Sequence, residues 1–581
     1  MVPDWLPGSV IYQIYPQSFN DSNGDGVGDL PGIEEKLDYV ASLGVDAIWL
    51  NPCFESPFFD AGYDVADYYK IAPRYGTNAD MARLVESARA RGIRVILDLV
   101  PGHTSIEHPW FKESAKGPDN EYGDCYIWKN RSYDPVEGPT EANYLKSFSP
   151  EEPALNYGYA KPSEPWQQGI DAPWPRRNRE ELRRIMAFWL DMGVSGFRVD
   201  MAFSLIKNDP GYGETNKLWT DIRSWLEKEY PDAVLLAEWS WPERAAEAGF
   251  HLDFMIHFHK ESYKSLFFNG SGTLPYDGPC YFDDRGEGTP WIFIREYMEQ
   301  WRAARGNGYI SLPTANHDFQ RLVCGRRDAD RARPAWVFLM TQPGIPTIYY
   351  GDEIGMRFLE DAPPKEGSTF TGITAPNGGA VEGERAGTRT PMQWTPGKNA
   401  GFSSAPEKDL YLPVDKAPAR PDVESQERDP DSLLNFVRLL LRIRKENPAL
   451  GADSEIEFLN PEGVDYPLAY LRSDGDSRFL VAVNPAGGKR DMALDIPVSG
   501  FRSVGAGSGS ADLRGIRGSV DGAFLLSGGG DILNPRFRAS RGVSGFFKTI
   551  ARFEFRLEVS FSPLHFPSGF FFFFSCLKPA F

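Results

Sequence analysis

The chain of 581 residues contains only five cysteines, and no two of them are near each other in sequence. They are Cys53, Cys125, Cys280, Cys324 and Cys576. A disulfide framework needs a denser set of cysteines, and a cysteine zinc site needs closely spaced pairs, so the sequence disfavours both. Sparse cysteines favour a reducing compartment, and we therefore predict a cytoplasmic protein.

The sequence also lacks long apolar runs and an excess of basic residues. No stretch reaches the ~20 apolar residues of a membrane helix, and the first residues lack the basic and apolar segments of a secretory signal. Lys and Arg number 62 against 81 Asp and Glu, which gives a formal net charge of −19. Nucleic acid is therefore disfavoured as a partner, because phosphate binding needs a basic surface.

Apolar segments of strand length alternate with segments of helical periodicity from residue 10 to residue 350. This order predicts a parallel sheet, and eight strand-helix units predict an α/β fold of the (β/α)8 TIM barrel type. Besides the strand that carries Arg198, we expect strands at residues 10–15, 47–50, 93–100, 233–237, 252–258, 309–312 and 345–350. Helices are expected at residues 32–43, 79–91, 180–190, 218–228 and 432–446.

Two parts of the chain depart from this alternation. Residues 104–177 are rich in Pro, Gly, Tyr, Trp and Asn without a helical pattern, which indicates an inserted subdomain after the third strand. Residues 449–500 contain short β patterns and predict an incomplete C-terminal all-β domain, which leaves residues 1–103 and 178–448 for the barrel. Residues 501–581 change composition and include a run of five Phe, so we interpret them as an atypical tail from an aberrant reading frame.

Polar residues follow several of the predicted strands. In barrels of this type the active site lies at the carboxyl ends of the strands, which makes these residues its candidates. They are Asp98, His103, Arg198, Asp200, Glu238, His317 and Asp318.

Arg198 and Asp200 lie two residues apart on one strand, so their side chains leave it on the same face. Alone, the pair is equally consistent with a structural salt bridge. As part of an active site, Arg198 would lower the pKa of Asp200 and keep it ionised for attack on a sugar carbon. Glu238 has apolar neighbours on both sides, which would raise the pKa of its carboxyl and make it a general acid.

The segment DSNGDGVGDL, residues 21–30, has oxygen-bearing residues at the spacing of a calcium loop. The side chains of Asp21, Asn23, Asp25 and Asp29 and the carbonyl of Val27 are the candidate ligands. The glutamate that closes an EF-hand loop is missing, and an Asx-rich surface turn is the alternative. We predict one structural Ca²⁺ or Mg²⁺ here and no organic cofactor.

Several motifs resemble glycoside hydrolase family 13, the α-amylase family, from about residue 5 to residue 497. DLVPGH, GFRVD, LLAEW and ANHD resemble its first four sequence blocks, and PALNYG is similar to its fifth. DAGYDVADYY, RTPMQW and DSNGDGVGDL resemble its α-glucosidase and oligo-1,6-glucosidase branch in particular.

The resemblance implies roles for the matching residues. Asp200 would be the nucleophile, Glu238 the general acid/base, and Asp318 the carboxylate that stabilises the transition state. The non-reducing glucose would be bound by Asp60, Tyr63, His103, Arg198, His317 and Arg389. Arg389, paired with Asp60 and assisted by Arg385, would close the pocket beyond that glucose.

Some residues depart from the family pattern. Gly102 stands where many amylases have Asn, and Phe203 and Ser204 stand where His or Lys is frequent. These departures disfavour the calcium site that endo-amylases carry between barrel and insertion. Met201 replaces the Val associated with 1,6-specific enzymes, which leaves the preferred linkage open.

The sequence thus predicts a retaining α-glucosidase that releases glucose from the non-reducing end of short α-linked oligosaccharides. A trehalose-synthase-like isomerase or transglucosylase is the alternative, because RTPMQW, NAGFSSA and LYLPVD resemble that branch too. A non-catalytic sugar-binding or transporter-associated relative is a third reading, disfavoured by the presence of all three carboxylates. The expected partner is an α-glucoside substrate, with no nucleic acid and no membrane, and the oligomeric state stays open.

Overall fold

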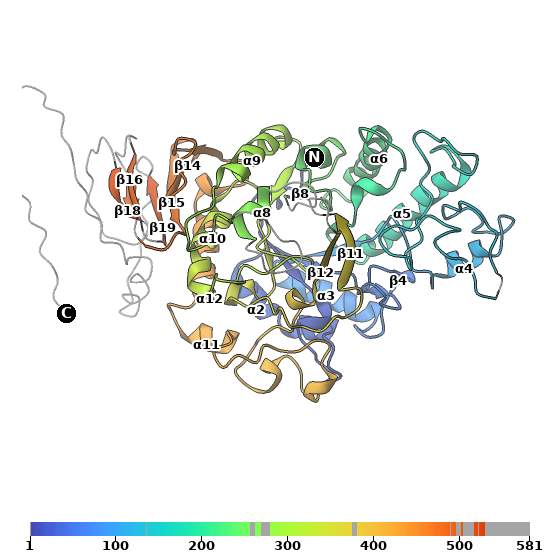
Figure 1. The fold of residues 1–581 in the computed structure, drawn as a ribbon, viewed down its shortest axis with the longest axis horizontal. Helices are drawn as coiled ribbons and strands as arrows, with labels where there is room; N and C mark the ends of the chain where they lie inside the picture. Colours follow the sequence, from blue (N-terminus) through green and yellow to red (C-terminus); the bar gives the residue numbers. More distant parts are fainter. Residues whose placement is uncertain are drawn as a thin grey trace, which may run out of the picture.

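The computed structural model describes residues 2–134, 136–255, 262–268, 279–374, 380–488, 490–494, 501–503, 516–520 and 522–528. An eight-stranded parallel sheet forms the centre of the molecule, in the order β10-β1-β2-β5-β6-β7-β8-β9 (Figure 1). The strands are β1 (Ile11–Ile14), β2 (Ala47–Leu50), β5 (Arg94–Leu99), β6 (Gly196–Val199), β7 (Val234–Ala237), β8 (Leu252–Phe254), β9 (Tyr309–Ser311) and β10 (Thr347–Tyr349).

Backbone hydrogen bonds between the two edge strands close the sheet into a barrel. Ile345 N donates to Ile310 O at 2.9 Å, and Thr347 N donates to Leu312 O at 3.4 Å. All four residues of β1, β2, β6 and β7 are buried, as expected for short strands covered on both faces. The predicted (β/α)8 barrel is confirmed.

Helices surround the barrel, and their ends follow local sequence signals. Thr77 and Asp80 form a capping box at the start of α3, and the Ser432 side chain accepts from Asn435 N at the start of α12. The surrounding helices are α1 (Leu30–Glu35), α2 (Leu37–Leu43), α3 (Asn78–Ala90), α5 (Pro173–Asp191), α6 (Gly213–Glu229), α7 (Pro242–Glu247), α8 (Ser262–Phe267), α9 (Trp291–Ala304), α10 (Ala329–Thr341), α11 (Val423–Arg428) and α12 (Leu433–Glu446). Of the described helices, none is long and apolar enough to cross a bilayer.

The inserted segment lies at the side of the barrel where α4 and α5 are seen in Figure 1. It contains the helix α4 (Pro109–Ala115), so the expectation that the insertion has no helix is wrong. Pro109 stands at the first helical position, and His108 Nδ1 accepts from Trp110 N at 3.1 Å. Both features mark the start of a helix, but the Pro- and Gly-rich composition of the segment concealed them. Stacked and edge-on rings of Phe111, Trp128 and Tyr144 form its local core.

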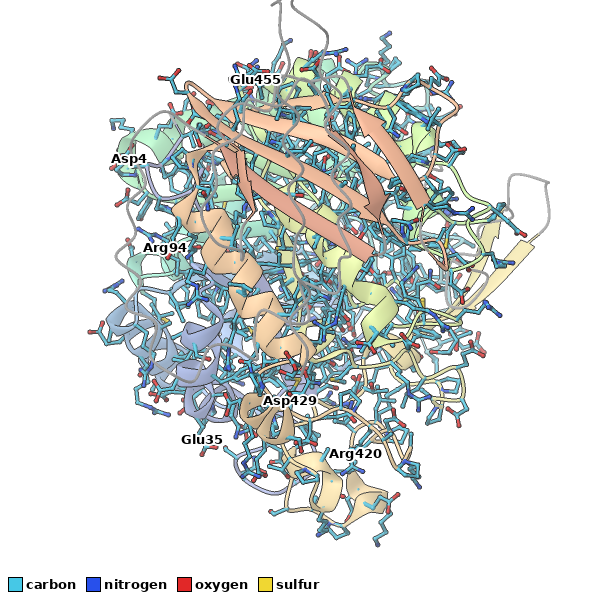
Figure 2. All side chains as sticks on the ribbon, turned by 90° about the vertical axis from the view of Figure 1, so that its left-hand side faces the viewer. Asp4, Glu35, Arg94, Arg420, Asp429 and Glu455 are labelled. Carbon is cyan, nitrogen blue, oxygen red and sulfur yellow. The ribbon has the colours of Figure 1, made fainter. Side chains whose placement is uncertain are left out.

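The C-terminal domain is a five-stranded sheet, in the order β13-β14-β15-β19-β17, at the opposite end from the insertion (Figure 1). Figure 2 views the molecule from the side of this sheet, with Glu455 at its border. The α10 helix packs against β15 and β19. The strands are β13 (Glu455–Phe458), β14 (Leu468–Asp474), β15 (Ser477–Asn484), β17 (Phe501–Ser503) and β19 (Gly522–Gly528), and β16 (Arg490–Leu494) pairs separately with β18 (Ile516–Val520).

The predicted end of this domain at residue 500 is too early. β19 pairs with β15 from Gly522 opposite Asn484 to Gly528 opposite Arg478, so it lies inside the sheet. Its short apolar core is flanked by glycines and serines, which concealed the strand in the sequence. The interpretation of residues 501–581 as an atypical tail is therefore wrong for the strands at 501–503, 516–520 and 522–528. Residues 529–581, including the Phe run, lie outside the described residues, and for them it stays a prediction.

Candidate active site

Arg198 is the centre of a polar cluster at the carboxyl ends of the strands. Its side chain is 2% exposed, and its Nη1 donates to Asp98 Oδ1 at 2.8 Å and to Asp200 Oδ1 at 3.0 Å. Its Nη2 pairs with Glu238 Oε1 at 2.9 Å. Asp98 lies opposite Arg198 in the β5–β6 register, and Glu238 directly follows β7. One guanidinium therefore joins carboxyl groups from three adjacent strands.

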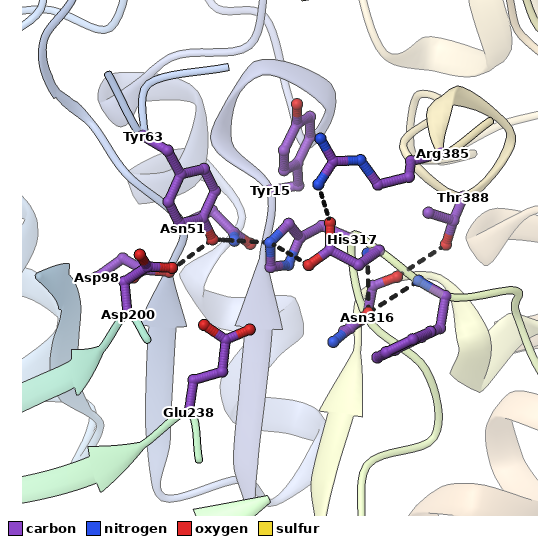
Figure 3. Close-up of polar contacts among 12 residues, drawn as sticks. Tyr15, Asn51, Tyr63, Asp98, Asp200, Glu238, Asn316, His317, Arg385 and Thr388 are labelled. Atoms are coloured by element: carbon purple, nitrogen blue, oxygen red, sulfur yellow. Dashed lines mark hydrogen bonds and ion pairs between the residues drawn. The ribbon is translucent and has the colours of Figure 1, made fainter. Parts of the chain in front are cut away.

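Glu238 is held on both carboxyl oxygens. Besides the pair with Arg198, its Oε2 accepts from Met201 N at 3.0 Å. Burial raises the pKa of Glu238 to about 8, against the lowering effect of Arg198, and the negative charges of Asp200 and Asp318 raise it further. The carboxyl points from the end of β7 toward the space beneath Tyr63 and His317 (Figure 3). At neutral pH Glu238 is therefore a proton donor, as its apolar neighbours predicted.

Asp200 differs from the prediction in the direction of its pKa. Burial raises the pKa of Asp200 above its ordinary value, and the positive charge of Arg198 offsets this effect without reversing it. A hydrogen bond from Glu238 also lowers the pKa of Asp200, which requires the proton on Glu238. The proton that the two carboxyls share thus resides on Glu238 rather than on Asp200.

His317 and Tyr63 connect this cluster to Asp318. Tyr63 Oη lies 2.7 Å from His317 Nε2 and donates to Asp98 Oδ2 at 3.1 Å, and the two rings stack (Figure 3). Gln13 Nε2 lies 3.0 Å from His317 Nδ1 and can only donate, so Nδ1 is the acceptor and the imidazole carries its proton on Nε2. That proton is shared between Tyr63 Oη, 2.7 Å from Nε2, and Asp318 Oδ2, 3.1 Å from Nε2.

The charge at Asp318 is fixed by two arginines. Arg385 Nη1 pairs with Asp318 Oδ1 at 2.6 Å, and Arg389 Nη2 pairs with the same oxygen at 3.2 Å. Burial raises the pKa of Asp318, but His317, Arg385 and Arg389 lower it more, to well below its usual range. Burial also lowers the pKa of His317, which keeps that ring neutral. His317 therefore acts on Asp318 as an N–H donor, and the arginines supply the charge.

The predicted pairing of Asp60 with Arg389 is wrong, because Arg385 takes this place. Arg385 Nη2 lies 3.1 Å from Asp60 Oδ1, so its guanidinium bridges Asp60 and Asp318. Arg385 follows the hairpin of β11 (Thr369–Thr374) and β12 (Ala380–Glu384), whereas Arg389 lies one turn further on and donates from Nε to His317 O at 2.8 Å. Burial raises the pKa of Asp60 to about 7, and Arg385 opposes this rise.

His103 also belongs to the site, and its partner comes from the insertion. His103 Nε2 lies 3.4 Å from Glu152 Oε1, and both side chains are buried. Burial lowers the pKa of His103, but Glu152, Asp200 and Asp60 together raise it more, and the net pKa lies above the ordinary value. The structure thus brings together the predicted residues Asp60, Tyr63, His103, Arg198, Asp200, Glu238, His317, Asp318 and Arg389.

A family model for the catalytic domain of α-amylases matches residues 13–453, which include the barrel, the insertion and all residues of this cluster. The chain belongs to the α-amylase family. This confirms the resemblance that the sequence motifs indicated, and the chain is an α-glucoside-active enzyme of that family.

Relatives in the α-amylase family have different activities in their names. Glucan 1,6-alpha-glucosidase of Streptococcus pneumoniae is 34% identical over 541 residues, which cover 85% of this chain and 94% of that protein. Trehalose synthase/amylase TreS of Mycobacterium tuberculosis is 33% identical over 535 residues, 82% of each chain. A crystal structure of trehalulose synthase MutB has a TM-score of 0.72 at 27% identity, covering 90% of this chain and 100% of that one. These relatives include hydrolases and synthases.

Sequence reasoning missed some residues of the site. Gln13 lies within β1 and Glu152 lies in the insertion, where no strand end marked them. Asn51 directly follows β2, and its Nδ2 donates to Tyr63 Oη at 3.1 Å, so its place at a strand end was an available signal. Asp98 was recognised at a strand end but was given no role, whereas it is a direct partner of Arg198.

The segment predicted to be a calcium loop contains Asx turns. Asp21 Oδ1 accepts from Asn23 N at 3.1 Å and Gly24 N at 2.7 Å, and Asp21 Oδ2 accepts from Gly26 N at 2.8 Å and from a serine hydroxyl. These four donors occupy the lone pairs of the Asp21 carboxylate, so a cation bound at Asp21 would replace one of them. Among the described residues, no three His, Cys, Asp or Glu side chains form a group suited to a metal ion. Metal binding by this loop stays a prediction.

Proposed function

We propose that the chain is a retaining α-glucosidase that removes glucose from the non-reducing end of short α-linked oligosaccharides. One observation carries the proposal. The Arg198 guanidinium contacts both Asp200 and Glu238, and burial raises the pKa of Glu238 to about 8. A retaining glycosidase needs two carboxyl groups close together, one of which holds a proton.

The reaction has two displacements. In the first, an Asp200 oxygen forms a bond to the anomeric carbon, the glycosidic C–O bond breaks, and the proton of Glu238 moves to the leaving oxygen. In the second, Glu238 takes a proton from water, the water oxygen bonds to the anomeric carbon, and the bond to Asp200 breaks. Two inversions retain the α configuration. Asp318, held ionised by Arg385 and Arg389, would accept hydrogen bonds from sugar hydroxyls.

Action at the chain end is supported by the bridge of Arg385 between Asp60 and Asp318. A buried arginine that spans two carboxylates forms a wall, and its polar groups suit a terminal glucose. A longer chain at this position would have to break this bridge and leave Asp60 and Asp318 without Arg385, which costs affinity. A digest of maltoheptaose tests the proposal: we expect glucose as the first product, in the α configuration by NMR. Early maltose and maltotriose without glucose would contradict it.

A trehalose-synthase-type isomerase is the second candidate. It is favoured by the relatives named trehalose synthase and by the motifs RTPMQW, NAGFSSA and LYLPVD. The isomerase would use the same first displacement, with a glucose hydroxyl in place of water in the second. Incubation with maltose separates the candidates, because the glucosidase yields glucose alone and the isomerase yields trehalose.

A further inference from the structure

The peptide bond between Glu238 and Trp239 is held from both sides. Its carbonyl, Glu238 O, accepts from Ala202 N at 3.2 Å, two residues beyond Asp200. Its N–H, on Trp239, donates to Asp253 Oδ1 at 2.9 Å. The orientation of this peptide plane fixes ψ of Glu238 and with it the direction in which the carboxyl leaves the backbone.

Asp253 binds the next two residues of the same loop as well. Ser240 N donates to Asp253 Oδ1 at 3.3 Å, and Trp241 N donates to Asp253 Oδ2 at 2.7 Å. Ser240 has a φ of 60°, a left-handed conformation that a non-glycine residue adopts only when its surroundings hold it. The Asp253 carboxyl group fixes this conformation, because it accepts hydrogen bonds from the backbone N–H groups on either side of Ser240, those of Trp239 and Trp241.

Asp253 is itself well fixed. It lies on β8 opposite Ala237 in the parallel register, and it is 1% exposed. Within the described part of the chain, no Lys, Arg or His side chain forms an ion pair with it. Burial raises the pKa of Asp253 to about 8, against the lowering effect of the backbone N–H groups of Trp239, Trp241 and Ser240. Both carboxyl oxygens of Asp253 thus serve as acceptors for the loop that follows Glu238.

We infer that Asp253 is a positioning residue for the general acid Glu238, because it orients the Glu238–Trp239 peptide from the neighbouring strand. The inference rests on the proposed role of Glu238. It predicts that loss of the Asp253 acceptor harms the step in which a proton reaches the leaving group, and spares the attack by Asp200.

The leaving group provides the test. A sugar alkoxide needs a proton in order to leave, whereas fluoride leaves with little help. Maltose therefore requires both the acid and the nucleophile, and α-glucosyl fluoride requires mainly the nucleophile. For Asp253→Asn we expect kcat/KM to fall roughly 10- to 100-fold with maltose, as for a displacement of about 1 Å, and less than about threefold with the fluoride. Asp253→Glu, which keeps the carboxyl group but shifts its position, should show the same selectivity if Asp253→Asn does not fold.

Two controls separate the possible failures. Asp422→Asn changes a buried carboxyl that accepts a similar bond, from Ser425 N at 2.8 Å at the start of α11, and should change neither rate more than about threefold. Glu238→Gln should show a stronger form of the same selectivity. If Glu238→Gln loses both substrates equally, the acid role of Glu238 falls. If Glu238→Gln is selective but both Asp253 variants lose both substrates equally, Asp253 has only a structural role and the inference is overturned.

Discussion

Replacing Glu238 by Gln should make the protein more resistant to alkaline pH. Burial raises the pKa of Glu238 to about 8, whereas an unfolded glutamate titrates at about 4.3. Between these values the folded state holds a proton that the unfolded state has lost, so the free energy of unfolding decreases as the pH rises. The contribution is fully present below pH ~4 and is lost above pH ~8. The glutamine variant remains neutral and does not suffer this loss.

The size of the effect follows from the gap between the two pKa values. At 1.36 kcal/mol per pH unit the gap corresponds to roughly 5 kcal/mol, and because Glu238 titrates together with Asp200 we expect roughly 3–5 kcal/mol. The domain at residues 13–453 has an unfolding entropy of roughly 0.9 kcal/mol per degree. The difference in Tm between variant and wild type should therefore change by about 3–5 °C in favour of the variant between pH 5 and pH 8.

Thermal unfolding at pH 5, 6, 7 and 8 measures this difference. Glu247→Gln, at a side chain of α7 that is 48% exposed, is the matched control for the removal of one carboxyl. A Tm difference for Glu238→Gln that stays constant over this pH range would refute the reasoning. It would mean that Glu238 ionises in the folded protein at an ordinary pH and cannot be the acid.

Three further predictions concern the pocket, the loop and the tail. Arg385→Ala should lower kcat/KM for maltose by about 100-fold, because it leaves Asp60 buried without its partner. The control Arg305→Ala, at the surface, should leave kcat/KM unchanged. Equal kcat/KM in the wild type and both variants would exclude a role of Arg385 in the pocket. Chelation should lower the Tm of the wild type but not of Asp21→Asn if the loop binds calcium, and an unchanged Tm with no metal in the protein would contradict the metal prediction. Limited proteolysis should remove residues 529–581 and leave β19 attached to β15; a tail that resists cleavage would contradict the aberrant reading frame.

Strand ends made much of the site predictable. Asp98, Arg198 and Glu238 lie at the carboxyl ends of neighbouring strands, so the alternation of strand and helix was enough to bring them together. Gln13 could not be found in this way, because a polar residue inside a buried strand has no local signal, and its partner His317 is 304 positions away.

Partners on long loops were less predictable than strand ends. Arg385 and Arg389 are one helical turn apart after the same hairpin, and the spacing alone did not decide which of them reaches Asp60. The pKa of Asp200 was misjudged for a related reason, because the sequence shows the neighbouring Arg198 but not the burial that outweighs it. The strand β19 was missed because its pairing with β15 depends on tertiary contacts rather than on its own composition.

The identity of the nucleophile is the central claim, and covalent trapping tests it most directly. A 5-fluoro-α-glucosyl fluoride forms the glycosyl-enzyme quickly and releases it slowly, so the intermediate can be digested and its peptides weighed by mass spectrometry. We predict one added fluoroglucosyl group on the peptide that contains Asp200, and none in Asp200→Asn. A label on another carboxylate, or turnover of maltose by Asp200→Asn at the wild-type rate, would contradict the account.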